Sequence, residues 1–61
     1  MDQHRILIVE DDEDIVETVR YCLELRGYSV DVAYDGLHAL RKAHRNEYDL
    51  MLLDIMLRAP F

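Results

Sequence analysis

The stretch ILIVEDD at Ile6–Asp12 places four aliphatic residues directly before three acids. A continuous aliphatic run of this length predicts a strand that is buried on both faces, as the strands of parallel sheets are. A second run of the same kind, Leu50–Leu53, is followed by Asp54. The sequence therefore predicts two buried strands: one at residues 5–9, which Glu10 follows, and one at residues 49–54, which ends in Asp54.

Between these two runs the apolar residues change their spacing. From Ile15 onward they recur with the period of an amphipathic helix, which predicts a helix over residues 13–26 with Asp12 as its N-cap and Gly27 as its stop. Residues 28–33 alternate with period two, as in a strand at a sheet edge. The pair Asp35-Gly36 then marks a turn and a cap, and a second, weaker helix is expected over residues 36–45.

The predicted order of elements is strand, helix, strand, helix, strand. This alternation specifies an α/β fold with parallel strands and right-handed crossovers. We expect the strand order 2-1-3, counted along the chain, with one helix on each face of the sheet. Three strands under single helices leave apolar surface and the outer edge of the last strand in water. The sequence therefore predicts a homo-oligomer, in which copies pair edges or pack helices.

Composition limits the possible functions of this 61-residue chain. Its formal net charge of −6 and pI near 4.7 argue against nucleic-acid binding, which requires a basic surface. No segment approaches the roughly 20 apolar residues that span a bilayer, and no secretory signal is visible, so we expect a cytoplasmic protein with no membrane contact. The single cysteine, Cys22, lies in an apolar helical pattern and is expected to be a small buried thiol.

Acidic residues follow the two aliphatic runs at the same edge of the predicted sheet. Adjacent parallel strands lie about 4.8 Å apart, so Glu10 and Asp11 should converge with Asp54. Carboxylates this close repel one another, and a hard divalent cation such as Mg²⁺ would relieve the repulsion. An ionised aspartate beside Mg²⁺ can attack phosphorus directly. For Asp12 two roles remain open: it could cap the following helix, or it could belong to this carboxylate cluster.

These residues give the chain a resemblance to a known family. The stretches Ile6–Asp12 and Tyr48–Leu57, with Asp35-Gly36 and Ala39-Leu40 between them, resemble the N-terminal half of the bacterial response-regulator receiver domain, which has a flavodoxin-like fold. The similarity covers residues 5–57. The ending Asp54–Leu57 looks most like regulators that carry a winged-helix DNA-binding domain.

The resemblance implies a role for each site residue. It makes Asp54 the acceptor of a phosphoryl group from a histidine kinase. It makes Asp11 and Asp54 direct Mg²⁺ ligands, gives Glu10 a contact through metal-bound water, and has Met56 offer its backbone carbonyl to the metal. A protein of this kind is a phosphoacceptor rather than an enzyme, with weak self-phosphorylation at most.

The sequence departs from the family after Leu57, where it continues as Arg58–Phe61. The family's phosphoryl-sensing Ser or Thr and its pairing Lys have no matching position here, since Thr18 and Lys42 lie on the two predicted helices. Loss of one preorganised donor costs on the order of 3 kcal/mol of transition-state stabilisation in other enzymes, so we expect slow phosphorylation. The pattern is that of a truncated, frameshifted or engineered half-domain.

Two rival functions remain open on the sequence. An aspartate-nucleophile phosphatase would need a second acid two residues after the nucleophile, where this chain has Met56. An interaction role, in which the half-domain dimerises or binds a partner without accepting phosphate, has no such obstacle. A short basic face formed by Arg41, Lys42 and Arg45 is expected to be solvated, and could meet an acidic partner.

Overall fold

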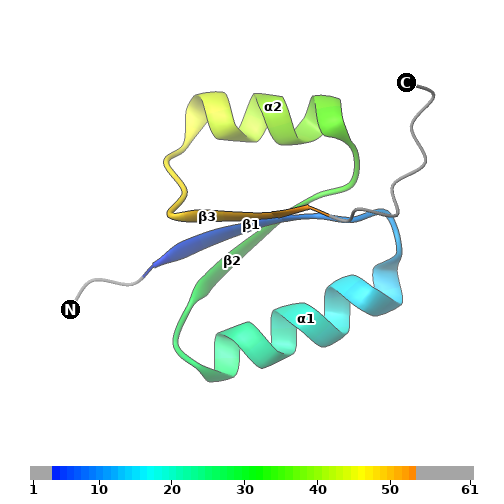
Figure 1. Ribbon diagram of the computed structural model, residues 1–61, viewed down its shortest axis with the longest axis vertical. Coiled ribbons are helices and arrows are strands. Elements are labelled where there is room, and N and C mark those ends of the chain that lie inside the picture. Colours follow the sequence, from blue (N-terminus) through cyan, green and yellow to red (C-terminus); the bar gives the residue numbers. More distant parts are fainter. Residues whose placement is uncertain (1–3, 54–61) are drawn as a thin grey trace.

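The structure is a computed structural model that describes residues 4–53, arranged as three parallel strands and two helices (Figure 1). The sheet has the order β2-β1-β3, and α1 and α2 lie on opposite faces of it. This confirms the α/β fold with strand order 2-1-3. The elements are β1 (Arg5–Val9), α1 (Glu13–Leu25), β2 (Ser29–Ala33), α2 (Gly36–Arg45) and β3 (Leu50–Leu53).

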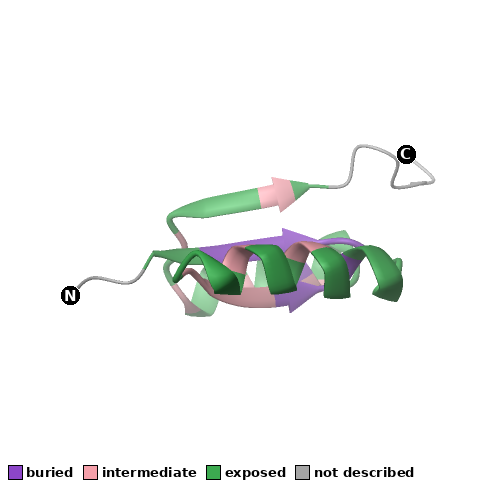
Figure 2. Ribbon diagram, turned by 90° about the horizontal axis from the view of Figure 1, so that it is seen from below, coloured by how far each residue is buried: buried purple, intermediate pink, exposed green. Residues whose placement is uncertain are grey.

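The central strand β1 forms the core of the molecule. Its residues Ile6–Val9 are all buried, and Leu7 and Val9 pack with Ala33 of β2 and Ala39 of α2. Tyr48, two residues before β3, packs against the same cluster. Burial is therefore concentrated where a strand has neighbours on both sides and a helix above it, as Figure 2 shows for β1 in purple.

Both helices begin and end where the sequence places their signals. Asp12 accepts hydrogen bonds from the backbone N–H groups of Asp14 and Ile15, and Asp35 accepts one from His38 N–H. Gly27 adopts a φ of 91° after α1, and its N–H bonds to Glu24 O. A left-handed residue here closes the helix at no steric cost only because it is glycine.

The outer strand β3 is not buried, which corrects the prediction from its aliphatic run. Leu50 is 51% exposed and Leu53 61% exposed, and the whole strand is mostly green in Figure 2. In the described part of the chain β3 has β1 on one side and no strand on the other. A continuous apolar run identifies a strand, but the neighbours of that strand decide its burial.

The thiol of Cys22 is exposed, so the prediction of a buried thiol was wrong. It lies on α1, where Ile15 is 47% exposed and only Val16 is fully buried. The sheet of three strands covers only part of the apolar stripe of this helix. Within residues 4–53, neither helix is long and apolar enough to cross a membrane.

Candidate functional site

The candidate site lies at the carboxyl ends of β1 and β3. The register pairs Val9 of β1 with Leu53 of β3, so the two strands finish level with each other. Glu10 and Asp11 follow β1 directly. Two other predicted members of the site, Asp54 and Met56, lie outside the described residues.

The first acid of the site, Glu10, is buried. It is 5% exposed, and its backbone N–H bonds to Ala33 O of β2 at 3.0 Å. Its Oε1 accepts a hydrogen bond from Asp12 N–H at 3.0 Å. These bonds hold the turn between β1 and α1 in a fixed shape, with the Glu10 carboxylate at the end of the central strand.

The next two acids, Asp11 and Asp12, differ in their environment and in their role. Asp12 caps α1 through its Oδ1, which is 2.9 Å from Asp14 N and 3.3 Å from Ile15 N. This geometry gives Asp12 the capping role that the sequence left open. Asp11 is exposed, so its carboxylate is accessible to a ligand from solvent.

The described residues contain two of the carboxylates that are expected to surround Mg²⁺. Hard carboxylate oxygens suit this ion, and Glu10 and Asp11 provide them at one strand end. No group of three or more possible metal ligands occurs among residues 4–53. The described donors fit Mg²⁺ in kind, and the expected shell is complete only with Asp54 and Met56.

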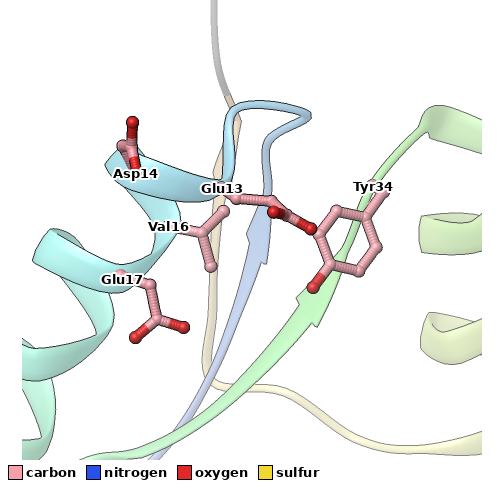
Figure 3. A pocket seen from close by; sticks show the side chains of 5 residues that line it. All are labelled: Glu13, Asp14, Val16, Glu17 and Tyr34. Atoms are coloured by element: carbon pink, nitrogen blue, oxygen red, sulfur yellow. The ribbon is translucent and has the colours of Figure 1, made fainter.

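Two hollows lie beside this end of the sheet. The first, about 150 Å³ in volume, is lined by apolar residues of β1, α1 and β3 together with Glu10: Ile8, Val9, Ile15, Val19, Leu52 and Leu53. The second, about 240 Å³, lies between α1 and the end of β2 and is lined by Glu13, Asp14, Val16, Glu17 and Tyr34. In Figure 3 the Glu13 side chain extends toward Tyr34, whereas the Asp14 carboxylate points away from it.

A carboxylate with several hydrogen-bond partners lies under α2, away from the candidate site, and the sequence did not reveal it. Asp31 of β2 accepts a hydrogen bond from Lys42 Nζ at 2.6 Å and another from Tyr48 Oη at 2.6 Å. Burial raises the pKa of Asp31, but the bonds from Lys42, Tyr48 and Val32 N–H outweigh burial and lower this pKa to about 2. Burial and the Asp31 carboxylate together raise the pKa of Tyr48.

The basic face of α2 is only partly solvated. Lys42 forms an ion pair with Asp31, whereas Arg41 and Arg45 are exposed. With Leu40 and His44 the two arginines line a shallow surface hollow. An acid inside an alternating strand, such as Asp31, was the one available signal that a cation from a helix would lie over β2.

Residues 6–59 match the family described as the response regulator receiver domain. The chain therefore belongs to the receiver domain family, which confirms the resemblance drawn from the acidic stretches. A comparison with solved structures found no match.

Several curated bacterial proteins are similar to the chain over 53 residues. The response regulator ArlR of Staphylococcus saprophyticus is 49% identical over 87% of this chain and 24% of its own length. The alkaline phosphatase synthesis transcriptional regulatory protein PhoP of Bacillus subtilis is 49% identical, with 22% of its length covered. The regulatory protein VanRB of Enterococcus faecalis is 51% identical, with 24% covered. The chain thus spans about a quarter of the length of these relatives.

Proposed function

We propose that this chain accepts a phosphoryl group on Asp54 from the phosphohistidine of a histidine kinase, in a reaction that depends on Mg²⁺. The observation that carries the proposal is the match to the receiver family over residues 6–59, which includes Asp54. The register of β1 and β3 supports the proposal. Val9 pairs with Leu53, so Glu10 and Asp54 are the next residues after a matched pair in neighbouring strands.

The chemistry is a displacement at phosphorus. A carboxylate oxygen of Asp54 attacks the phosphorus atom, a new O–P bond forms, and the N–P bond to the donor imidazole breaks. The imidazole nitrogen keeps the electron pair and takes up a proton. The chain is the acceptor in this transfer and does not turn over a substrate of its own, so we do not propose an enzyme.

Mg²⁺ would offset the negative charge that gathers between the carboxylates and the phosphoryl oxygens. Asp11 would bind the metal directly through its exposed carboxylate. Glu10 would act through metal-bound water, as the similarity to the receiver family implies, while its Oε1 accepts the Asp12 N–H. Asp54 and the Met56 carbonyl would complete the protein ligands.

The test is incubation of the 61-residue chain with a small-molecule phosphodonor and Mg²⁺, followed by intact mass measurement. We expect the mass of one added phosphoryl group, and we expect it to disappear in Asp54→Asn and after chelation of the metal. Asp14→Asn is the matched control, since Asp14 is an exposed acid in the first turn of α1. An unmodified chain at every Mg²⁺ concentration would refute the proposal.

A second candidate function is self-association or partner binding without phosphorylation, and the exposure of β3 favours it. Leu50, Met51 and Leu53 are 51%, 39% and 61% exposed on a strand that has one strand neighbour in the described region. An exposed apolar edge strand is a template for pairing with another chain. For either function we propose the cytoplasm as the location and no binding of nucleic acid by this chain.

Light scattering coupled to size-exclusion chromatography separates this candidate from a monomeric acceptor. At micromolar concentration we expect a mass of at least two copies. A folded monomer across the accessible concentration range would exclude self-association, and it would leave the phosphoacceptor proposal to its own test.

A further inference from the structure

We infer that Asp49 is a positioning residue for the phosphoacceptor: its hydrogen bonds with Arg5 fix the register of β3 on β1 and so place Asp54 level with Glu10. The inference rests on the proposed phosphorylation of Asp54 and adds a residue at the other end of the same strand. Asp49 lies directly before β3, at the amino ends of the strands. Five residues of parallel strand span about 16 Å, so Asp49 would act through β3 and not by touching the metal or the phosphoryl group.

Asp49 and Arg5 exchange two hydrogen bonds where β3 begins to run beside β1. The Arg5 N–H donates to Asp49 Oδ2 at 2.7 Å, and the Asp49 N–H donates to Arg5 O at 2.8 Å. The bond from the Arg5 N–H also lowers the pKa of Asp49, so the carboxylate is ionised near neutral pH and is a strong acceptor. Both bonds together require Asp49 to lie beside Arg5, which is the register that pairs Ile6 with Leu50.

The side chains of β3 do little to select this register by themselves. The strand reads LMLL over Leu50–Leu53, and it lies against ILIV, residues 6–9 of β1. A shift by one or two residues exchanges one apolar side chain for another, so hydrophobic patterning leaves the register weakly specified. A polar contact at the start of the strand supplies the information that the pattern lacks, and Asp49 makes that contact.

The register decides whether the acids of the site can share a metal ion. The observed pairing ends with Val9 opposite Leu53. The next residues in the two strands are Glu10 and Asp54. A slip by one residue moves β3 about 3.3 Å and turns its side chains to the other face, and a slip by two residues moves it about 6.6 Å. Mg²⁺ holds its ligands at about 2.1 Å, so either slip would remove the Asp54 carboxylate from the expected shell.

The contacts around Asp49 define what a test has to separate. Tyr48 bonds through its hydroxyl to Asp31 of β2, and its ring contacts the Arg5 guanidinium. These contacts hold the segment through side chains, whereas Asp49 bonds to the backbone of β1. His4 Nδ1 lies 3.5 Å from Asp49 Oδ2, so the charge of Asp49 has to be distinguished from its hydrogen bonds.

Three substitutions of Asp49 make this distinction. Asp49→Asn removes the charge but keeps an acceptor oxygen at the same distance from the backbone. Asp49→Glu keeps the charge but moves it outward by one methylene group, and Asp49→Ala removes both. The register is measured in the metal-free chain by nuclear Overhauser effects between the backbone protons of Val9 and Leu53. Calorimetric titration gives the Mg²⁺ affinity, and the phosphorylation rate is measured with a small-molecule phosphodonor.

We expect Asp49→Asn to retain the Val9–Leu53 contact and to keep its Mg²⁺ affinity within about twofold, because the amide oxygen still accepts the Arg5 N–H. In Asp49→Ala the contact should weaken or move to another residue. Its Mg²⁺ affinity should fall at least about threefold, because only chains in the correct register bind the ion. Phosphorylation at low Mg²⁺ should slow by the same factor and recover at saturating Mg²⁺, which draws the population back to that register. Asp49→Glu should resemble Asp49→Ala.

Tyr48→Phe is the matched control for lost stability. It removes a hydrogen bond to a carboxylate from the same segment and leaves the bonds between Asp49 and Arg5 in place. We expect it to lower the unfolding midpoint while the Val9–Leu53 contact and the Mg²⁺ affinity stay unchanged. Equal losses of affinity in Tyr48→Phe and Asp49→Ala would overturn the inference, because general destabilisation would then explain both.

Other outcomes are equally decisive. An Asp49→Ala chain with the register and Mg²⁺ affinity of the unmodified chain would refute the positioning role. If Asp49→Ala does not fold, the other two variants decide: the role requires affinity to be retained in Asp49→Asn and lost in Asp49→Glu, and the reverse order would assign the effect to charge. The register measurement needs neither metal nor phosphate. A chain that accepts no phosphate therefore refutes the proposed function, while the position of β3 in the variants still decides the role of Asp49.

Discussion

The Tyr48 hydroxyl donates a 2.6 Å hydrogen bond to Asp31 Oδ2, which joins the segment between α2 and β3 to the middle of β2 across 17 positions of sequence. Lys42 of α2 holds the other oxygen of the same carboxylate. Asp31 of the edge strand β2 is thus bonded both to α2 and to the segment between α2 and β3. The Arg5 guanidinium lies 5.1 Å from the centroid of the Tyr48 ring and adds a cation–π contact on the same residue.

Removal of the Tyr48 hydroxyl should therefore destabilise the fold. Tyr48→Phe keeps the ring in the core cluster and loses only a hydrogen bond to a charged group, for which about 1.5 kcal/mol is the expected cost. Urea unfolding followed by circular dichroism measures it. Tyr21→Phe is the matched control, because Tyr21 is 65% exposed on α1. Equal effects of the two substitutions would contradict this role for Tyr48.

The same network predicts a dependence of stability on pH. The pKa of Asp31 is lowered from 3.8 to about 2, so the folded state favours the ionised carboxylate. The resulting stabilisation is fully present above the unfolded pKa and is lost as the pH falls from about 4 to 2. Because the Asp31 side chain is 35% exposed, solvent screening limits the contribution to roughly 1 kcal/mol.

The measurement compares the unfolding free energy of the chain and of Asp31→Asn at pH 6 and pH 2. We expect the two proteins to differ more at pH 6, where Asp31 is charged, than at pH 2, where it is largely neutral in the unfolded state. A difference that stays constant with pH would show that the carboxylate charge contributes nothing.

Local patterns predicted the elements and their order, because they depend on signals a few residues apart. The aliphatic run before Glu10, the cap Asp12 and the stop Gly27 act on their own neighbours, and the structure has each where the sequence placed it. The exposure of β3 and of Cys22 was missed because burial depends on elements that pack from elsewhere. The Asp31 network was missed because the rotation of α2 over β2 decides which side chain meets the acid.

The N-cap of α1 provides a prediction that separates stability from phosphorylation. Asp12→Ala removes the acceptor for the Asp14 and Ile15 N–H groups and should cost about 1 kcal/mol of unfolding free energy. Asp12→Ser should recover most of that loss, since serine is also a good N-cap. We expect both variants to accept phosphate with little change in affinity for Mg²⁺. If Asp12→Ser remained destabilised to the same extent, capping would not be the role of Asp12.

The exposed carboxylate of Asp11 should instead govern the metal. Asp11→Asn keeps the size of the side chain and removes the charge, so we expect at least about a tenfold loss of Mg²⁺ affinity, because the ion is held chiefly by hard, charged oxygen ligands. Unfolding free energy should change little, because Asp11 is exposed and caps neither helix. Phosphorylation should fall in proportion and recover at high Mg²⁺ concentration. Calorimetric titration of Mg²⁺ beside the phosphorylation rate measures both effects, with Asp14→Asn as the control, and an Asp11→Asn chain with unchanged metal affinity would remove Asp11 from the site.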